Sequence, residues 1–336
     1  MTEQPQPLTL LLSDFALRTW GTRIAAADAG LSLVTAEGAL AAEGPSAIDI
    51  AFMTREVTGR SSKDNQTPEL RGFEAVLRKS PKLRWLQIHP AGAERPIYRE
   101  LRDRGVKVTT ASGATAVTVS HSVLGAVIAV NRRFPLLADA QRRHAWEPRL
   151  GERSPRDLKG QCAVIVGMGP IGRNIAALLK MLGMRVVGVR RTAEPAAPCD
   201  QTIAYGQLLD VLPKADWLVL CCPASTVTRG IANAAAFAAM PMGSHFVNVS
   251  RGEIAVEKDV IEALQSGRLA GAYLDVFERE PLDPASPLWD MPNVLVSPHT
   301  ASHSLGQNEA IFDIFLDNLA RFRDGRKLRN DVDDLS

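Results

Sequence analysis

The sequence has few of the features that mark secreted, membrane or metal-binding proteins. Cysteine occurs four times in 336 residues, and Cys162, Cys199, Cys221 and Cys222 show neither paired zinc-binding spacing nor a disulfide framework. No apolar run approaches the ~20 residues of a membrane-spanning helix, and no basic segment precedes the short apolar run at Leu8–Leu12. We therefore expect a cytoplasmic protein with reduced thiols, no bound metal and no membrane contact.

A surplus of charge of either sign is also missing. Lys and Arg number 39 against 37 Asp and Glu, which gives a formal net charge of +2. This balance is too even for a nucleic-acid-binding surface, so nucleic acid is not an expected partner. The hydrophobic fraction of 46% and the charged fraction of 23% are typical of a globular protein, and the length allows two domains.

Short apolar segments alternate with helical patterns in the first third of the chain. Strands are expected at Leu8–Leu12, Leu31–Thr35, Ile48–Met53, Leu83–Ile88 and Lys107–Thr109. Helices are expected at Trp20–Ala29, Pro68–Lys79 and Arg95–Arg104, with a polar loop at Ser61–Pro68. Strands separated by helices predict a parallel sheet that is covered on both faces, so this part is expected to form an α/β domain of its own.

The next segment, Ala116–Arg133, is apolar on most faces. Such a helix is normally buried in a core or in a subunit contact, and its lone histidine, His121, is expected to be buried with its hydrogen bonds satisfied. Phe134–Pro155 mixes proline, arginine and tryptophan and predicts an irregular connection. Strands are then expected at Ala163–Val166, Val186–Val189, Asp216–Cys222, Ser244–Val249, Gly271–Val276 and Val294–Ser297, and a last helix at Gly306–Phe322.

The stretch Cys162–Arg191 predicts a dinucleotide-binding unit. Gly167, Gly169 and Gly172 have the spacing G-x-G-x-x-G directly after the buried strand at Ala163–Val166, and a helix and a second strand follow in register. We expect Gly167 to allow the tight turn, Gly169 to let a pyrophosphate approach the backbone, and Gly172 to let the helix lie close to the strand. The alternative is an ordinary strand-to-helix turn without a ligand. The strand, helix and second strand around the glycines favour the dinucleotide-binding unit over this alternative.

The end of the second strand bears on the choice of cofactor. In an NAD-binding unit, an acidic residue about twenty residues beyond the glycine motif accepts hydrogen bonds from the ribose hydroxyls. This chain has Arg190, Arg191 and Thr192 there instead. Guanidinium groups match the oxygens of a 2'-phosphate, so we expect NADPH to be preferred and NAD to be possible. The alternative is a pair of solvated surface arginines.

Three short motifs are expected at or after the carboxyl ends of successive strands in this second domain. They are Asn248–Gly252, Asp275–Leu282 and Ser297–Ser302. Because the carboxyl ends of parallel strands share one edge of a sheet, a cation, a carboxylate and an imidazole are expected to converge where a nicotinamide would lie.

The side chains in these motifs suit the reduction of a 2-keto acid. Arg251 can pair with the substrate carboxylate, and His299 can donate a proton to the ketone oxygen near neutral pH. Glu280 can keep that imidazole charged and fix its ring. Taken singly, each has a structural explanation, as a surface arginine, a loop cap or a backbone-bound histidine. Together on one edge they favour catalysis.

A loop of the first domain, His89–Ala93, directly follows an expected strand, at the end where open α/β sheets bind ligands. Its exposed amides around Gly92 could bind a carboxylate or could simply form a turn. The spacing alone favours neither.

These motifs together resemble the D-isomer-specific 2-hydroxyacid dehydrogenase family, which includes glyoxylate and hydroxypyruvate reductases and phosphoglycerate dehydrogenase. The resemblance spans nearly the whole chain, and it also includes Leu288–Val294. It implies a catalytic trio of Arg251, Glu280 and His299. It further implies that the Ala91 and Gly92 amides help Arg251 to hold the substrate carboxylate.

The resemblance also implies a fold class, namely α/β with two doubly wound parallel-sheet domains. A Rossmann cofactor domain at 113–299 would be inserted in a discontinuous, flavodoxin-like substrate domain made of 1–112 and 300–336, and the two would close by a hinge. Members are usually homodimers through the cofactor domain, which would account for the apolar helix at Ala116–Arg133.

The cofactor contacts follow from the glycine motif and the neighbouring strand ends, and the resemblance implies that Asp275 lies beside the nicotinamide carboxamide. The cofactor-binding residues expected in this way are Gly167, Met168, Gly169, Pro170, Ile171, Gly172, Arg190, Arg191, Thr192, Cys222, Pro223 and Asp275.

Two positions depart from the family pattern. Arg190 replaces a frequent acidic residue and resembles the NADPH-using reductases, while His121 stands where many members carry glutamate. The sequence thus predicts an oxidoreductase that reduces a small 2-keto acid, such as glyoxylate or hydroxypyruvate, to the D-2-hydroxy acid by hydride transfer from NADPH. The alternatives on the same architecture are a dinucleotide-sensing, corepressor-like scaffold and a phosphite dehydrogenase.

Overall fold

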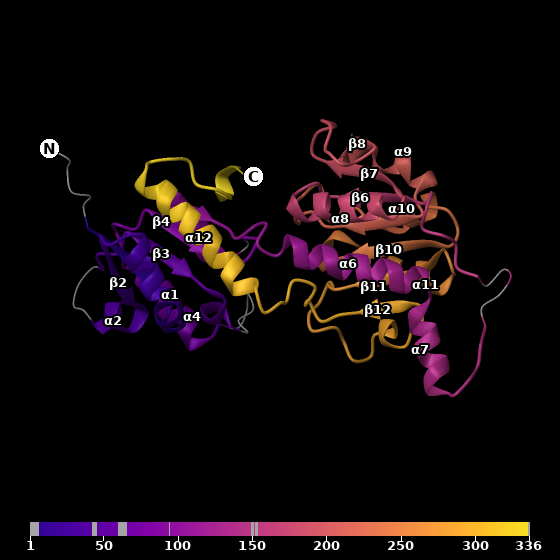
Figure 1. Ribbon diagram of the computed structural model, residues 1–336, viewed down its shortest axis with the longest axis horizontal. Coiled ribbons are helices and arrows are strands. Elements are labelled where there is room, and N and C mark those ends of the chain that lie inside the picture. Colours follow the sequence, from indigo (N-terminus) through magenta and orange to yellow (C-terminus); the bar gives the residue numbers. More distant parts are fainter. Residues whose placement is uncertain are drawn as a thin grey trace. The chain divides into compact units, whose positions relative to one another are not determined.

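A computed structural model of the protein describes residues 7–41, 46–59, 66–93, 95–148, 151 and 154–334. The chain divides into two compact units (Figure 1). Unit 1 consists of Met1–Ala114 and Gly306–Ser336, and unit 2 is the continuous segment Thr115–Leu305. Each unit contains one parallel sheet, so the expected α/β fold with two parallel-sheet domains is confirmed.

The sheet of unit 1 has five parallel strands in the order β2-β1-β3-β4-β5, which is the flavodoxin-like order. The strands are β1 Leu8–Leu12, β2 Leu31–Thr35, β3 Ile50–Met53, β4 Trp85–Ile88 and β5 Lys107–Thr109. The helices are α1 Asp14–Ala27, α2 Ala36–Ala41, α3 Arg55–Thr58, α4 Pro68–Arg78, α5 Pro96–Asp103 and α12 Gln307–Arg323. Apolar residues of α4 and α5 cover one face of the sheet, and those of α1 and α12 cover the other.

The C-terminal helix α12 belongs to unit 1 because its aromatic side chains complete the core there. The Phe312 ring stacks on Trp20 of α1 with 4.7 Å between centroids. The Phe315 ring stacks on Phe52 of β3 at 4.4 Å. Figure 1 shows α12 in yellow beside α1, although nearly the whole sequence separates them.

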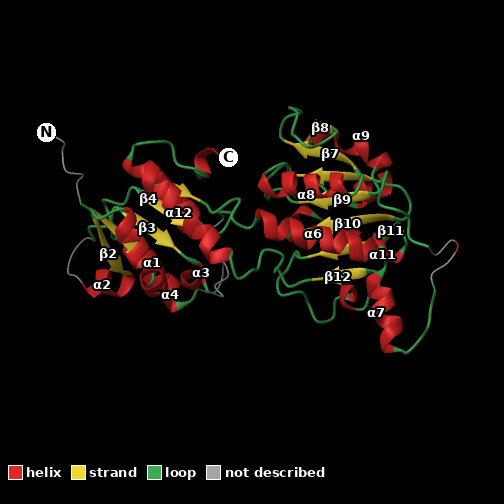
Figure 2. Ribbon diagram, in the orientation of Figure 1, coloured by secondary structure: helices red, strands yellow, loops and turns green. Residues whose placement is uncertain are grey.

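The sheet of unit 2 has seven parallel strands in the order β12-β11-β10-β9-β6-β7-β8. They are β6 Cys162–Val166, β7 Arg185–Arg190, β8 Gln201–Ala204, β9 Trp217–Leu220, β10 Ser244–Asn248, β11 Leu269–Leu274 and β12 Val294–Val296. The α-helices are α6 Ala116–Asn131, α7 Phe134–Arg142, α8 Pro170–Met181, α9 Leu208–Val211, α10 Ala234–Ala239 and α11 Glu257–Gln265. Helices α6 and α8 pack on one face, where Figure 2 labels both, and α10 and α11 pack on the other.

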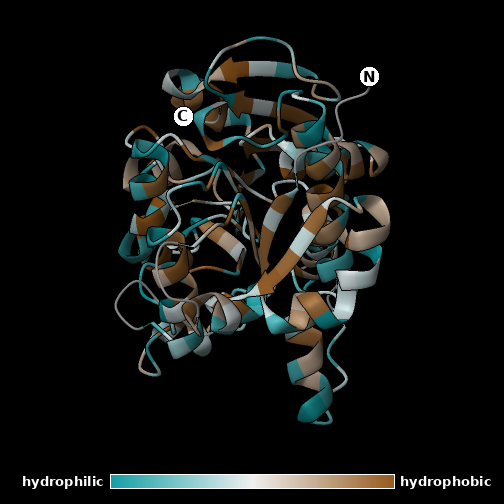
Figure 3. Cartoon of the chain, turned by 90° about the vertical axis from the view of Figure 1, so that its left-hand side faces the viewer, coloured by the Kyte–Doolittle hydropathy of each residue, from teal (hydrophilic) through white to brown (hydrophobic). Residues whose placement is uncertain are grey.

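The strand order of unit 2 reverses at β6, because β7 and β8 continue the sheet on one side and β9 to β12 on the other. The glycine motif follows β6, so it lies at the switch point where such sheets bind ligands. All five residues of β6 are buried, and the strands that can be seen in Figure 3 include brown, apolar stretches. This is the pattern of parallel sheets covered on both faces. Among the described helices, none combines the length and the apolar character needed to cross a membrane.

Several expected elements differ from the structure. Helix α1 begins at Asp14 rather than Trp20, because the Ser13 hydroxyl caps it by accepting a hydrogen bond from the Ala16 amide at 3.0 Å. The short helix α2 and the edge strand β8 were not expected. The loop expected at Ser61–Pro68 lies mostly outside the described residues.

Two expectations near α6 are wrong. Phe134–Pro155 is not irregular throughout, because it begins with α7, whose first turn contains Pro135. Proline is compatible with a first helical turn, where amides have no partner within the helix. His121 is exposed on α6 rather than buried, because the sheet-facing positions of this helix belong to residues such as Val123 and Val127.

Candidate active site

The turn between β6 and α8 has the geometry that the glycine motif predicts. Gly167 has φ +110°, and a Cβ there would lie 2.6 Å from the Cys222 amide nitrogen. A Cβ on Gly172 would lie 1.8 Å from the Gly167 carbonyl oxygen, whereas a Cβ on Gly169 would have nothing within 4 Å. Side chains are therefore excluded from the turn itself, and open space remains at Gly169.

Helix α8 begins at Pro170, directly beside this open space. The first amides of an α-helix have no acceptor within the helix, and they carry the positive end of its dipole. A pyrophosphate fits such a position. The Met168 side chain takes no part, because it is buried with its sulfur 3.8 Å from Cys199 Sγ, so only its backbone is available to a ligand.

The cationic pair lies at the end of β7. Arg190 is its last residue and half-buried, and Arg191 is exposed. Burial raises the pKa of Tyr205 to about 12, and the positive charges of Arg190 and Arg191 oppose that rise, which places both near this phenol. The thiol of Cys222, which lies just beyond β9, also raises the pKa of Tyr205. The ends of β7 and β9 thus border one region, with Thr192 exposed beside it.

His299 and Glu280 form a direct pair, with 2.8 Å between Nδ1 and Oε2. This hydrogen bond raises the pKa of His299 above its usual value, although burial opposes it. For Glu280, burial raises the pKa, but the hydrogen bond and the charge of His299 outweigh it and leave the pKa lowered. The positive charge of Arg251 lowers the pKa of both Glu280 and His299, which places Arg251 near them. The structure therefore brings together the three residues expected to converge.

The backbone of His299 adopts an unusual conformation, with φ +55°. Asp275 fixes this backbone through both its main-chain carbonyl and its side-chain carboxylate. Its carbonyl oxygen accepts a hydrogen bond from the His299 amide at 2.8 Å, and its buried carboxylate accepts bonds from the Thr300 amide at 2.8 Å and the Ala301 amide at 3.0 Å. The Ser297 hydroxyl donates to the same carboxylate at 2.5 Å. A left-handed histidine at this position is kept in place by its surroundings.

The loop that carries Arg251 is fixed by two neighbours. The Asn248 side chain accepts a hydrogen bond from the Ser250 amide at 3.1 Å and donates one to the Arg251 carbonyl at 3.2 Å. A Cβ on Gly252 would lie 1.9 Å from the Phe277 carbonyl carbon. The Arg251 loop therefore packs directly on the backbone of the loop that carries Glu280.

Ala91 and Gly92 lie in unit 1, in the loop after β4. In the same unit, His89 is hydrogen-bonded through Nε2 to the Thr58 hydroxyl at 2.9 Å. Burial, followed by the charges of Arg55 and Arg95, lowers the pKa of His89 to about 3. This imidazole is neutral at neutral pH.

Sequence reasoning gave no role to three residues that build this site. Asn248, Ser297 and Gly252 were included in motifs, but no contact was assigned to them. The signal for Gly252 was a glycine next to the candidate cation, which is typical of a close backbone approach. The role of Ser297 depends on Asp275, 22 residues earlier in the chain, so no local pattern could reveal it. Asn248 contacts residues two and three positions later, and such local hydrogen bonds are typical of an asparagine in a turn.

Comparison with known proteins gives the family. The model of the NAD binding domain of D-isomer specific 2-hydroxyacid dehydrogenases matches residues 124–301, more than half of the chain. The glyoxylate/hydroxypyruvate reductase B of Escherichia fergusonii is 32% identical over 263 residues, which cover 77% of this chain and 81% of that protein. The chain belongs to the D-isomer specific 2-hydroxyacid dehydrogenase family. It is an NAD(P)-dependent dehydrogenase or reductase, as the motifs predict.

Solved structures agree with this family. An NADPH-dependent glyoxylate/hydroxypyruvate reductase from Sinorhizobium meliloti, in complex with NADP and sulfate, is 29% identical with a TM-score of 0.75, and the match covers 98% of this chain and 99% of that one. A D-isomer specific 2-hydroxyacid dehydrogenase from Xanthobacter autotrophicus, in complex with NADPH and MES, is 28% identical with a TM-score of 0.75 and 97% and 98% coverage. The 2-hydroxyacid dehydrogenase fold thus extends over both units.

Proposed function

We propose that this 2-hydroxyacid dehydrogenase reduces a small 2-keto acid to the D-2-hydroxy acid with NADPH. Glyoxylate and hydroxypyruvate are the first candidates. The observation that carries the proposal is the hydrogen-bonded His299–Glu280 pair near Arg251, on the same edge of the unit 2 sheet as the glycine turn. Relatives that are named glyoxylate/hydroxypyruvate reductases support this substrate class.

In the proposed reaction, Arg251 pairs with the substrate carboxylate and the Ala91 and Gly92 amides help to hold it. When bound, the dinucleotide supplies the hydride. His299 donates its proton to the ketone oxygen, and it does so through Nε2 because Nδ1 is engaged by Glu280. Glu280 raises the pKa of His299, which favours the protonated ring that acts as the general acid. In the reverse direction the neutral ring of His299 is the base.

The preference for NADPH rests on Arg190, Arg191 and Thr192, which we propose to bind the 2'-phosphate. Both related structures described above carry NADP or NADPH. The remaining cofactor contacts of this proposal are the residues from Gly167 to Gly172, Cys222, Pro223 and Asp275. The carboxylate of Asp275 would serve the nicotinamide while it also fixes the loop after β12.

The domain roles and the assembly complete the proposal. We assign the substrate domain to 1–112 and 300–336 and the cofactor domain to 113–299. A homodimer through the cofactor domain is supported by apolar side chains exposed on α6 and beyond it, such as Val117 at 57% and Trp146 at 96%. Sedimentation velocity tests the dimer. A reducing compartment such as the cytoplasm agrees with the four free cysteines.

A substrate panel tests the proposed function. Glyoxylate, hydroxypyruvate, pyruvate and phosphite would be assayed with each of the four nicotinamide cofactors, reduced forms for keto acids and oxidised forms for phosphite. We expect NADPH consumption that depends on glyoxylate or hydroxypyruvate, with a higher kcat/KM than for NADH. Turnover of phosphite alone would favour the phosphite dehydrogenase. No turnover of any compound, together with tight dinucleotide binding, would favour the sensing scaffold.

A further inference from the structure

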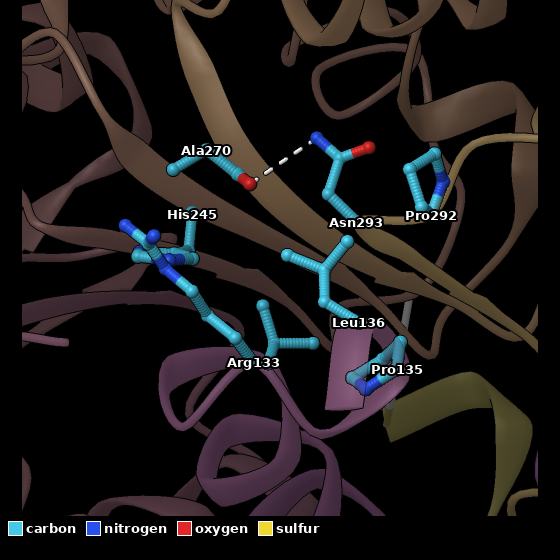
Figure 4. Close-up of a pocket in the computed structure, with 8 residues that line it drawn as sticks. Arg133, Pro135, Leu136, His245, Ala270, Pro292 and Asn293 are labelled. Carbon is cyan, nitrogen blue, oxygen red and sulfur yellow. Dashed lines mark hydrogen bonds between the residues drawn. The ribbon is translucent and has the colours of Figure 1, made fainter. Parts of the chain in front are cut away.

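Two cavities border opposite ends of the strands in unit 2. The larger, of about 260 Å³, is lined by Ala270, the second residue of β11, whose carbonyl accepts a hydrogen bond from Asn293 Nδ2 at 3.2 Å (Figure 4). The smaller is lined by Asn248 and Leu274, the last residues of β10 and β11. The smaller cavity therefore lies on the edge where the candidate catalytic residues follow their strands. One acidic side chain, that of Glu257, also lines it.

Helix α11 begins at this acidic residue and has no capping side chain of its own. Its N-cap residue is Val256, whose side chain makes no hydrogen bond to the helix. The first amides of a helix have no acceptor within it, and an Asp, Asn, Ser or Thr at the N-cap usually supplies one. The other acid of the first turn, Asp259, accepts from the Ala234 amide at 2.7 Å instead. The acceptor for the start of α11 comes from another loop.

That acceptor is Glu278, in the loop after β11. The Glu257 amide donates to Glu278 Oε1 at 3.0 Å, and the Glu278 amide donates to Glu257 Oε2 at 3.1 Å. Each carboxylate thus binds the backbone of the other residue, although the two are 21 positions apart in the chain. This reciprocal pair fixes the loop after β11 to the first turn of α11.

The charges of the two carboxylates do not hold the pair together. Burial raises the pKa of Glu257, the hydrogen bond from the Glu278 amide opposes that rise, and the negative charge of Glu278 adds to it. The two charges repel each other, so the pair depends on its acceptor oxygens. A neutral glutamine at either position should therefore keep the connection, whereas an alanine should break it.

The loop fixed in this way carries Glu280. The Phe277 amide donates to Glu280 Oε1 at 3.1 Å, and Glu280 Oε2 is bonded to the His299 ring at 2.8 Å. The same stretch of backbone packs on the loop that carries the candidate cation, because a Cβ on Gly252 would lie 2.3 Å from the Glu278 amide nitrogen. The backbone that orients the Glu280 carboxylate is thus the backbone that α11 holds.

We propose that Glu257 and Glu278 are positioning residues of the proposed reaction, because their exchange of amide hydrogen bonds holds the Glu280 carboxylate against the His299 ring. The inference rests on the proposed function and adds two residues that act through Glu280 rather than by contact with the reacting groups. Helix α11 packs on the face of the sheet opposite to α6, so the pair is separate from the surface proposed for the dimer.

The effect passes through the geometry of the loop. Among the described groups, the charges that shift the pKa of His299 are those of Glu280, Arg251 and Asp275. Removing the charge of Glu257 or Glu278 alone should therefore leave the His299 ring unchanged, whereas removing the acceptor should release the Glu280 carboxylate from it.

The pKa of His299 tests this role without turnover. It is measured by NMR on the whole protein with 13C-labelled histidine, and the His299 signal is the one that is missing in His299→Gln. In Glu278→Ala and Glu257→Ala the pKa of His299 should fall, because the hydrogen bond from Glu280 is weakened. In Glu278→Gln and Glu257→Gln it should stay near that of the wild type.

Steady-state kinetics with glyoxylate and NADPH give the second readout. Both alanine variants should lower kcat at pH 8 by about tenfold, the effect of one lost charge-assisted hydrogen bond, and leave the Kd for NADPH unchanged. Both glutamine variants should keep most of the turnover. Glu262→Ala is the matched control, since Glu262 is an exposed acid of the same helix that pairs with Lys258 at 3.6 Å, and it should behave like the wild type.

Melting temperatures near that of the wild type would show that the variants are folded. Glu278→Asp, whose carboxylate is one methylene further from the Glu257 amide, is the milder change if an alanine variant does not fold, and it should also lower the pKa of His299. An unchanged pKa of His299 in the alanine and aspartate variants, or equal changes in the glutamine variants, would overturn the proposal. A wild type that reduces no keto acid would refute the proposed function instead, and the NMR comparison would still decide the positioning role.

Discussion

Each unit has a histidine after a strand at the carboxyl edge of its sheet, and the two have opposite electrostatic surroundings. In unit 1, His89 is bonded to the neutral hydroxyl of Thr58, and burial with nearby arginine charge lowers its pKa to about 3. In unit 2, His299 is bonded to the carboxylate of Glu280, which raises its pKa. Position at the carboxyl edge of a sheet therefore does not by itself set the pKa of a histidine. Burial and the charges around the ring decide whether the pKa of a histidine is lowered or raised.

The largest expected effect is the loss of turnover when His299 is replaced. His299→Ala should lower kcat for glyoxylate reduction by roughly 10²–10⁴, the range for loss of a general acid, with the Kd for NADPH nearly unchanged. Steady-state rates and fluorescence titration with NADPH measure the two quantities. His89→Ala is the matched control and should retain most of the turnover. Equal losses in both variants would contradict the role given to His299.

The second-largest effect concerns Glu280, the hydrogen-bond partner of His299. Glu280→Gln removes the carboxylate that raises the pKa of His299, so the ring loses its proton at lower pH. Because reduction needs the protonated ring, the falling limb of the kcat profile should move to lower pH. Above neutral pH the rate should drop about tenfold for every pH unit by which that limb moves. Profiles from pH 5 to 9 for both enzymes measure it. An unmoved profile with uniformly lower rates would mean that Glu280 only supports the loop.

The arginines at the two sheet edges can be compared in the same way. Alanine at both Arg190 and Arg191 should raise the KM for NADPH by about tenfold or more, as expected for lost charge-assisted hydrogen bonds, and change the KM for NADH little. Arg55→Ala, in unit 1, is the control and should leave the NADPH to NADH ratio unchanged. Equal effects of the double variant on both cofactors would remove the assignment to the 2'-phosphate.

The smallest effects concern the pH dependence of the free energy of unfolding, to which His89 and His299 should contribute with opposite sign. The pKa of His89 is about 3 in the fold and near 6.5 in an unfolded chain, so below pH ~6.5 only the unfolded state binds the proton. The free energy of unfolding should fall by up to about 1.4 kcal/mol for each pH unit from this group. Urea denaturation at pH 7 and pH 5 should show a weaker pH dependence in His89→Gln. An identical pH dependence would mean that His89 is protonated in the fold.

The corresponding contribution of His299 has the opposite sign. Its pKa is raised in the fold, so its stabilisation is present below the pKa of the unfolded chain and is lost as the pH rises through the folded pKa. The side chains of His299 and Glu280 are 47% and 37% exposed, so solvent screening keeps this contribution small. Unfolding of His299→Gln at pH 5 and pH 8 should differ little from the wild type.

The regular parts of the fold were predictable because buried parallel strands are short apolar runs between helical patterns. The missed elements lack that signal. Strand β8, Gln201–Ala204, is a polar edge strand that pairs with β7 alone, and α7 opens with a proline that suggested a break. Ser13 was a readable cap for α1, and its position before Asp14 shows that the polar start of a helix is easily missed when only apolar residues are counted.

The site was predictable as far as residue types and strand ends could indicate it. Arg251, Glu280 and His299 follow different strands, and parallel strands bring their carboxyl ends to one edge. The contacts that orient them were not predictable, because the Asp275 carboxylate meets amides 25 and 26 residues later. Such pairs depend on how two loops fold against each other.

The stacking of α12 on α1 and β3 sets an order of events during synthesis. Unit 2 is one continuous stretch, and all of it is synthesised before the last helix is made. Unit 1 must wait with Trp20 and Phe52 uncovered until Phe312 and Phe315 emerge. The half made first is thus completed last, and a stop codon before α12 would leave that apolar face exposed to aggregation.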